Sequence, residues 1–196
     1  MRMAKVAIFA SGRGSNFIAI HEYLESIKNQ PHCICCLVTD KPKSGAAEYA
    51  AIHNIPILSM DYSKGKSREN IETELISQLK PLGAELLVLA GFMRLLTPVL
   101  IDAWQERIIN IHPALLPKYK GAHGIEESYA STDLVLGITI HYVDAGLDSG
   151  PILIQKSFER QGTESLEEIR QRIHELEHAT YPKLVHSLLD NIVKSH

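Results

Sequence analysis

Short apolar runs alternate with helical patterns through the first half of the chain, and this alternation limits the fold more than any other feature. One of these runs, Glu85–Ala90, is apolar at nearly every position, as expected of a strand that is covered on both faces. A strand–helix–strand order of this kind predicts a parallel sheet wrapped by helices, that is, a doubly wound Rossmann-like α/β fold with helices on both faces. The predicted strands are Ala4–Ala10, Cys33–Thr39, Ile55–Leu58, Glu85–Ala90 and Ile108–Ile111.

The segments between these runs carry apolar residues at spacings of three and four, which is typical of amphipathic helices. Pro81 and Gly83 are expected to end the third of these helices, because both residues disfavour continuation. The four predicted helices span Phe17–Ile27, Ala46–His53, Ser67–Leu79 and Pro98–Trp104.

The pattern changes after Pro113, where a loop leads to a short helix near Ile125–Ser131. Two strands, Val135–Val143 and Ile152–Phe158, then follow with no helix between them. Two strands joined by a short loop are typically antiparallel neighbours. We therefore expect an antiparallel C-terminal strand pair on an otherwise mostly parallel sheet.

A last helix is expected from about Ser165, with Thr163 or Ser165 as its cap and acidic residues in its first turn. Pro182 should kink this helix or restart it, because proline lacks the backbone N–H that a helix interior uses. We find no internal repeat or linker in the 196 residues, so we expect residues 1–196 to form a single domain.

Composition excludes several classes of protein. The chain is 45% hydrophobic and 22% charged, with a net charge of −3, and no block of Lys and Arg suggests nucleic-acid binding. The longest apolar stretches, such as Leu86–Ala90, are too short to span a membrane. The N-terminus enters a strand-like run without a secretion signal, so we expect a cytoplasmic protein.

The cysteines and histidines give no reason to expect a metal. Cys33, Cys35 and Cys36 lack a second cysteine pair, so they are expected to be free thiols in a buried strand. Among the ten histidines we expect no pair at helical spacing with a carboxylate that completes a metal site.

The loop Ser11–Asn16 joins the first predicted strand to the first helix and contains Gly12 and Gly14. Backbone N–H groups and the positive end of the helix meet in such a loop and favour a bound phosphate. Phe17 stands where a dinucleotide-binding loop has its third glycine, and the Walker pattern is absent. The loop therefore favours a phosphorylated small substrate over NAD, although a tight turn with a helix cap would explain it as well.

Asn110 and His112 interrupt the apolar run Ile108–Ile111 at alternate positions, just before Pro113. Strand periodicity places both side chains on one face, at the carboxyl end of a strand, where open α/β sheets bind ligands. An amide and a protonated imidazole suit the oxyanion that forms during acyl transfer, and Asp148 could hold His112 charged. Since no Ser or Cys nucleophile accompanies them, we expect direct attack by an amine. From spacing alone, a buried structural Asn–His pair fits equally well.

Three motifs of this chain resemble one family. Asn110–Pro117 followed by Leu147–Pro151 looks like the signature of the folate-dependent formyltransferases, and Gly91–Leu96 resembles the folate-binding segment of that family. Gly12–Asn16 resembles the corresponding loop in the branch of the family that formylates phosphoribosylglycinamide in purine synthesis. The resemblance runs from about Val6 to Pro182 without large gaps.

The resemblance implies a transferase that uses 10-formyltetrahydrofolate as formyl donor and needs no metal. It also implies a role for each matching position. The catalytic residues would be Asn110, His112 and Asp148. Substrate would bind at Gly14, Ser15, Asn16 and Glu177. Folate would bind at Arg68, Met93, Arg94, Leu95, Leu96 and Asn110, with the loop Asp144–Asp148 over the pterin.

The resemblance divides the single domain into a phosphate-binding half, residues 1–100, and a catalytic and folate-binding half, residues 101–196. The expected partners are a phosphorylated small molecule and folate, without nucleic acid or membrane, in a monomer or a homodimer. Two positions depart from the family. Ala114 replaces a common Ser, and His174 replaces a common Gln, which leaves the ligand role of His174 open.

The sequence leaves undecided the roles of two further histidines and the choice between several rival functions. His141 could support the active site or simply be packed, and His123 could face the substrate or lie on a surface loop. Related formyl-handling enzymes are the nearest rivals: methionyl-tRNA formyltransferase, formyltetrahydrofolate hydrolase and sugar-nucleotide formyltransferase. A non-catalytic nucleotide-binding module is the rival from another class.

Overall fold

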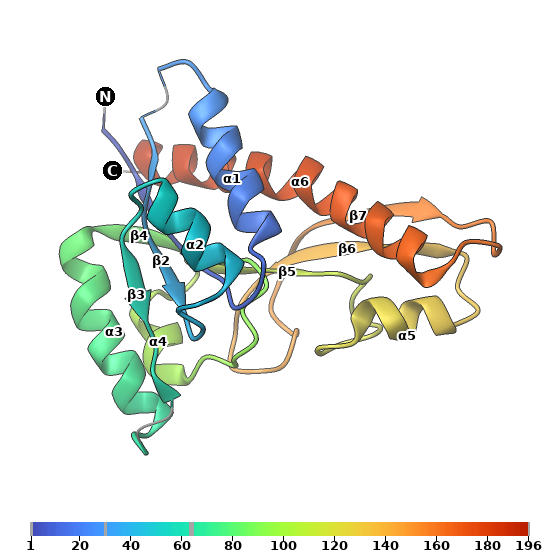
Figure 1. Ribbon diagram of the computed structural model, residues 1–196, viewed down its shortest axis with the longest axis horizontal. Coiled ribbons are helices and arrows are strands. Elements are labelled where there is room, and N and C mark those ends of the chain that lie inside the picture. Colours follow the sequence, from blue (N-terminus) through green and yellow to red (C-terminus); the bar gives the residue numbers. More distant parts are fainter. Residues whose placement is uncertain (1, 30, 63–64, 196) are drawn as a thin grey trace.

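The computed structural model describes residues 2–29, 31–62 and 65–195. Their core is a seven-stranded sheet in the order β3-β2-β1-β4-β5-β6-β7 (Figure 1). The strands β1 to β5 pair in parallel, whereas β5–β6 and β6–β7 are antiparallel. The predicted fold class, a doubly wound and mostly parallel sheet with an antiparallel C-terminal pair, is confirmed.

The described elements follow the predicted order, with ends displaced by a few residues. The strands are β1 (Lys5–Phe9), β2 (Cys33–Thr39), β3 (Ile57–Ser59), β4 (Ala84–Leu89), β5 (Ile108–His112), β6 (Val135–Tyr142) and β7 (Ile152–Glu159). The helices are α1 (Ser15–Ser26), α2 (Gly45–Ile52), α3 (Arg68–Leu82), α4 (Pro98–Ala103), α5 (Gly124–Ala130) and α6 (Leu166–Lys194).

Both prolines that were expected to interrupt a helix lie inside one. Pro81 belongs to the last turn of α3, and the helix ends instead at Gly83, whose left-handed backbone lets its N–H donate to the carbonyls of Leu79 and Lys80. Pro182 lies within α6, which does not restart there. Its neighbours Tyr181 and Val185 are fully buried, so packing against the sheet holds the helix together across the missing hydrogen bond.

The start of α6 follows one of the two expected alternatives. Ser165, rather than Thr163, is the cap: its hydroxyl accepts from the N–H of Glu168, and the Glu168 carboxylate accepts from the N–H of Ser165. This reciprocal pair is a capping box, which satisfies backbone donors that the first helical turn leaves unpaired.

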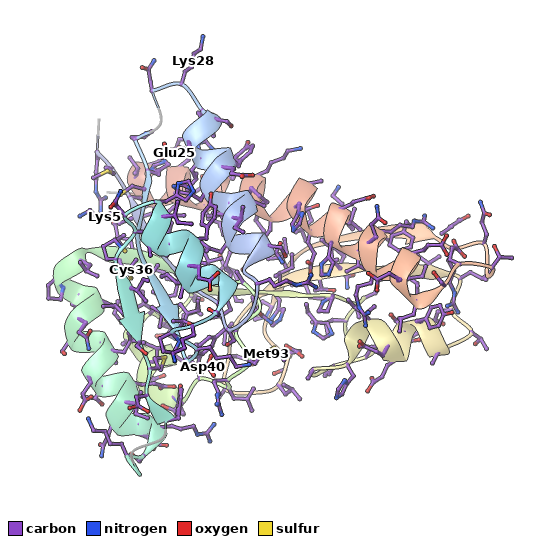
Figure 2. The ribbon with its side chains drawn as sticks, in the orientation of Figure 1. Lys5, Glu25, Lys28, Cys36, Asp40 and Met93 are labelled. Atoms are coloured by element: carbon purple, nitrogen blue, oxygen red, sulfur yellow. The ribbon has the colours of Figure 1, made fainter. Side chains whose placement is uncertain are left out.

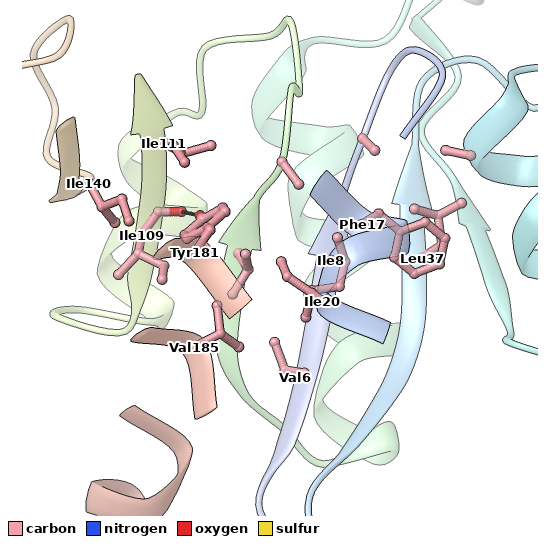
Figure 3. Packing of buried hydrophobic residues seen from close by; sticks show 14 of the residues in the cluster. Val6, Ile8, Phe17, Ile20, Leu37, Ile109, Ile111, Ile140, Tyr181 and Val185 are labelled. Carbon is pink, nitrogen blue, oxygen red and sulfur yellow. Dashed lines mark hydrogen bonds between the residues drawn. The ribbon is translucent and has the colours of Figure 1, made fainter. Parts of the chain in front are cut away.

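Each face of the sheet has its own hydrophobic core. On one face, residues of α1, α2 and α6 cover the strands, with Ile20, Tyr181 and Val185 packed near Ile8 and Ile109 (Figure 3). On the other face α3 and α4 cover the sheet. Cys35 and Cys36 are buried and Cys33 is half-buried, all with free thiols, as the sequence predicted.

Helix α6 is also bonded to the strands that carry the candidate site. The hydroxyl of the fully buried Tyr181 donates to the carbonyl oxygens of Leu89 on β4 and Ile109 on β5, at 3.0 and 3.3 Å. The carboxyl end of β4 and the start of β5 are thereby fixed relative to α6. None of the described helices combines the length and apolar character needed to cross a membrane.

Candidate active site

One cavity of about 940 Å³ runs along the carboxyl ends of β1, β4 and β5. Its volume is within the range of small-molecule sites. Every residue to which the family resemblance assigned a catalytic or binding role lines it. These residues are Gly14, Ser15, Asn16, Arg68, Met93, Arg94, Leu95, Leu96, Asn110, His112, Asp144, Asp148 and Glu177.

The three proposed catalytic residues converge at the middle of this cavity. The Asn110 amide nitrogen lies 3.5 Å from Asp148 Oδ1, and His112 Nδ1 lies 3.4 Å from Asp148 Oδ2. His141 completes the group, because antiparallel pairing of β5 and β6 puts it opposite Asn110. Its Nε2 is 3.3 Å from the Asn110 amide nitrogen and 3.6 Å from Asp148 Oδ1. His141 therefore contacts the trio directly and is more than a packed strand residue.

Asp148 reaches this position through a constrained loop. Its backbone has φ of 46°, in the left-handed region that few residues other than glycine adopt. The N–H of Gly121 donates to its Oδ2 at 2.8 Å. Within the same loop Asp144 Oδ1 accepts from the N–H of Gly146 and the hydroxyl of Ser149. Strained backbone of this kind is often found where a structure fixes a functional side chain.

Backbone carbonyls determine which nitrogens of the two histidines carry protons. His112 Nε2 is 2.7 Å from the carbonyl of Tyr119, and His141 Nδ1 is 2.8 Å from the carbonyl of Tyr142. A carbonyl can only accept, so each of these nitrogens is protonated. In the neutral rings, His112 Nδ1 and His141 Nε2 are therefore unprotonated, and both face Asp148.

Burial decides the charge of the pair. It lowers the pKa of His112 below its usual value of 6.5, and the opposing effects of Asp148 and the Tyr119 carbonyl are smaller. Burial acts to raise the pKa of Asp148, but the nearby His141, the N–H of Gly121 and the nearby His112 hold it below 3.8. At neutral pH Asp148 is thus ionised and His112 is neutral. The charged resting state that we expected of His112 is not supported, because desolvation outweighs the carboxylate.

The loop Ser11–Asn16, called the glycine loop below, forms one end of the cavity. Gly14 is the left-handed N-cap of α1, with φ of 79°, and a Cβ there would lie 2.7 Å from the side chain of Ala46. Asn16 is buried and donates from Nδ2 to Glu177 Oε2 at 2.9 Å. Phe17 is fully buried in the core, which accounts for a bulky residue where dinucleotide loops have glycine.

Glu177 connects the glycine loop to His174 on α6. His174 Nδ1 lies 3.0 Å from Glu177 Oε2, and this hydrogen bond raises the pKa of His174 above 6.5. His178 also lines the cavity, and its buried Nε2 has no hydrogen-bond partner among the described residues. Sequence analysis missed His178, although its position one turn after His174 could have indicated it.

His174 and His178 also correct our view of the histidines. They are four residues apart on α6 with Glu175 after the first, a spacing that zinc enzymes use, so the prediction that the chain has no such histidine pair is wrong. The two rings are stacked with centroids 6.3 Å apart, and His174 Nδ1 is engaged by Glu177. Their ligand atoms do not form a preassembled metal site.

A separate group of metal-binding residue types lies between the start of β1 and the end of α6. One ligand atom from each of His32, His186 and Asp190 lies within 4.8 Å of the others. However, His32 Nδ1 accepts from the N–H of Ala4, so its proton is on Nε2, which lies 3.0 Å from Asp190 Oδ1. A metal bound to Nε2 would have to displace that proton. The three side chains are therefore better suited to link α6 to the first strand.

His123 and Ala114 are the two remaining positions that the sequence analysis discussed. His123 is exposed at the N-cap of α5 and is absent from the described cavity lining, so the structure does not support a substrate contact for it. Ala114 is 1% exposed, and its carbonyl accepts from the hydroxyl of Thr139.

Fold and site define the class of protein. Residues 4–185 match the formyl transferase family model, and the chain belongs to that family. The resemblance read from the sequence motifs is confirmed, as is the prediction of an enzyme.

Individual relatives show which members of the family the chain is similar to. The chain is 42% identical to phosphoribosylglycinamide formyltransferase of Bacillus subtilis (strain 168) over 187 residues, 95% of both chains. It matches the crystal structure of phosphoribosylglycinamide formyltransferase from Bacillus halodurans with a TM-score of 0.89 and 41% identity, covering 94% of this chain and 95% of that one. It is also 33% identical to the trifunctional purine biosynthetic protein adenosine-3 of Drosophila melanogaster, over 96% of this chain but only 14% of that longer protein.

Proposed function

We propose that this protein transfers the formyl group of 10-formyltetrahydrofolate to the amine of phosphoribosylglycinamide, a step of de novo purine synthesis. The observation that carries the proposal is the continuity of one cavity from the glycine loop, through Asn110, His112 and Asp148, to Arg68 and the segment Met93–Leu96. Such a cavity holds two substrates end to end. The names of the bacterial relatives support the same acceptor.

The acceptor is proposed to bind at the end formed by Gly14, Ser15, Asn16 and Glu177. The left-handed cap at Gly14 exposes the N-terminus of α1, where backbone N–H groups and the helix dipole stabilise a phosphate. Glu177 is 4% exposed and can accept hydrogen bonds from the hydroxyl or amide groups of the substrate. These contacts would direct the amine towards the middle of the cavity.

The donor is proposed to bind at the opposite end. Met93 and Leu95 are 60% and 58% exposed there and offer apolar contacts to a flat pterin ring. Arg68 lies at the first position of α3 and is exposed in the cavity wall, where its charge suits the glutamate carboxylates of folate. The loop Asp144–Asp148 would cover the pterin.

Chemistry begins when the amine nitrogen attacks the formyl carbon. A new C–N bond forms, the carbonyl oxygen becomes an oxyanion, and the Asn110 amide donates to it. The bond between the formyl carbon and N10 of folate then breaks, and N10 takes up a proton while the amine loses one. No covalent intermediate with the protein is required.

His112 and Asp148 are proposed to handle that proton. Since His112 Nε2 already donates to Tyr119, its unprotonated Nδ1 beside Asp148 is the atom that can accept the proton from the attacking amine. The imidazolium so formed is stabilised by the ionised Asp148 and can donate to the oxyanion or to the leaving N10. The charged His112 that the sequence suggested would then exist during the reaction rather than before it.

The test is deformylation of 10-formyltetrahydrofolate by the purified protein, with and without phosphoribosylglycinamide. We expect deformylation that depends on the acceptor and yields formylated acceptor in equal amount. Asn110→Ala should slow it roughly 10²–10³-fold, because one oxyanion donor is lost. Glu85→Gln, which removes only the surface ion pair with Arg2, should leave the rate unchanged.

Other outcomes would reject the proposal. Deformylation without acceptor would indicate a hydrolase, and formyl transfer to a sugar nucleotide instead would indicate that branch of the family. Ligand binding that survives in Asn110→Ala, without formyl transfer by the parent protein, would indicate a binding module. The cytoplasmic location stays a prediction from the sequence.

A further inference from the structure

The segment Met93–Thr97, which forms the proposed donor end of the cavity, is held from beneath by three buried side chains. Ser11 Oγ accepts from the N–H of Met93 at 3.0 Å. Asp40 Oδ2 accepts from Arg94 Nε at 2.8 Å. The Glu72 carboxylate accepts from the N–H of Thr97 at 2.8 and 3.1 Å.

Asp40 is the link to strand β2. It follows the last residue of that strand, and its side chain is 1% exposed; Asp40 and Met93, the neighbour of Arg94, are both labelled in Figure 2. Burial acts to raise the pKa of Asp40, but Ser11 and the Arg94 guanidinium together hold it below 3.8. The same guanidinium lies over the ring of Tyr62, 4.9 Å from its centroid. Arg94 is thus fixed on two sides, by a carboxylate and by an aromatic face.

Glu72 is the link to helix α3. It is fully buried, and besides the Thr97 N–H it accepts a short hydrogen bond from the Thr97 hydroxyl. Thr97 is the N-cap of α4, so the carboxylate lies at the positive end of that helix. A buried carboxylate with these donors is costly to disturb, and it fixes the point where the segment enters α4.

The outer residues of the segment depend on these anchors. Met93 and Leu95 are largely exposed to the cavity, Arg94 between them also lines it, and Thr97 at the end of the segment is buried. From these contacts we infer that Asp40 and Glu72 are positioning residues, which set the backbone of Met93–Thr97 for binding the formyl donor. The inference rests on the proposed function, because it takes this end of the cavity as the folate site.

A positioning role and a merely structural role predict different kinetics. If Asp40 acts through Arg94 on the donor site, its loss should raise the KM for the donor and leave the KM for the acceptor, bound about the glycine loop, unchanged. If it only stabilises the fold, both constants should stay the same while the melting temperature falls.

The experiment compares Asp40→Asn with the parent protein and with Glu85→Gln, which breaks an ion pair at the far, amino end of β4. We expect Asp40→Asn to raise the donor KM about tenfold, the amount expected for loss of one charge-assisted hydrogen bond. The acceptor KM and kcat should stay within about twofold of the parent values. The double variant Asp40→Asn/Arg94→Ala should be no worse than Arg94→Ala alone, since Asp40 acts through Arg94.

Glu72→Gln gives an independent measurement, with Glu74→Gln as its control on the same helix. Glu74 is exposed and pairs with Lys66, so its loss should leave the donor KM unchanged. Glu72→Gln should raise the donor KM in the same way as Asp40→Asn. Equal changes in the donor KM and the acceptor KM would overturn the inference. So would a double variant Asp40→Asn/Arg94→Ala whose effect is the sum of the two single effects.

Calorimetric titration with tetrahydrofolate separates failure of the inference from failure of the proposed function. No binding by the parent protein would overturn the proposed function, and the inference with it. Equal affinity of the parent and of Asp40→Asn would overturn the inference alone. Affinity about tenfold weaker in Asp40→Asn, with Glu85→Gln unchanged, would support it.

Discussion

At the scale of single residues, the chemistry of the site depends on where two protons are placed. The carbonyls of Tyr119 and Tyr142 each occupy one nitrogen of a histidine, so the other nitrogens of His112 and His141 turn towards Asp148. Burial keeps His112 neutral in the resting protein. The protein therefore presents a proton acceptor beside an anion, which suits a reaction that must remove a proton from an amine.

Replacing Asp148 by Asn should lower the pKa of His112 further, because the carboxylate is the main group that raises it. Formyl transfer should fall by about 10²-fold or more, since the imidazolium formed during the reaction loses its counter-ion. NMR titration of the imidazole would measure the pKa, with His112→Asn identifying the signal.

Asp190→Asn is the control for that prediction, because it removes a carboxylate bonded to the remote His32. It should change neither the His112 titration nor the rate. An unchanged or higher pKa of His112 in Asp148→Asn would contradict the electrostatic argument.

The His174–Glu177 pair gives a prediction about stability and pH. The folded pKa of His174 is raised above its usual 6.5, so the pair stabilises the fold fully below that value and loses its effect as pH rises through the folded pKa. His174→Gln should lower the melting temperature at about pH 5.5 but much less at about pH 9. Because the histidine is 41% exposed, the difference should stay below about 1 kcal/mol. A larger loss at high pH would contradict the sign.

At the scale of elements, periodicity predicted the type and order of the helices and strands, and the bounds of β2 agree residue for residue. It failed at Pro81, which lies inside α3, and α6 does not restart at Pro182, because local propensity carries no information on the packing that holds these helices together. The sequence analysis expected the contact between His112 and Asp148, but other contacts of the site were beyond its reach. Asn16 and Glu177, for example, are 161 residues apart in sequence and meet only because α1 and α6 pack on the same face of the sheet.

The glycine loop allows a matched pair of substitutions. Gly14→Ala should destabilise the protein, because alanine in the left-handed region costs about 1–2 kcal/mol and the contact with Ala46 adds about 1–3 kcal/mol. Gly12 has no heavy atom near its would-be Cβ and no left-handed φ, so Gly12→Ala should change stability by less than about 1 kcal/mol. Urea unfolding would measure both free energies. If Gly12→Ala lost as much free energy of unfolding as Gly14→Ala, the loop would tolerate no side chain at either position.

At the scale of the whole molecule, the two proposed halves share a single core. Val6, Ile8 and Ile20 from the first half are fully buried in one cluster with Ile109, Tyr181 and Val185 from the second (Figure 3). The sheet also crosses the division, since β4 pairs with β5. The division into a phosphate-binding and a catalytic half stays a proposal about function, and neither half has a core of its own on this face.

This shared core predicts that residues 1–100 do not fold alone. Without α6, the face of β1 and α1 that holds Val6, Ile8 and Ile20 would be exposed, and each such side chain loses roughly 1.5–3 kcal/mol of burial. That loss is comparable with the whole stability of an ordinary domain, about 5–15 kcal/mol. The full chain should unfold in one transition that far-UV and near-UV circular dichroism report at the same temperature. The fragment should show no cooperative transition, and one that melts cooperatively as a monomer would mean that the first half is a domain by itself.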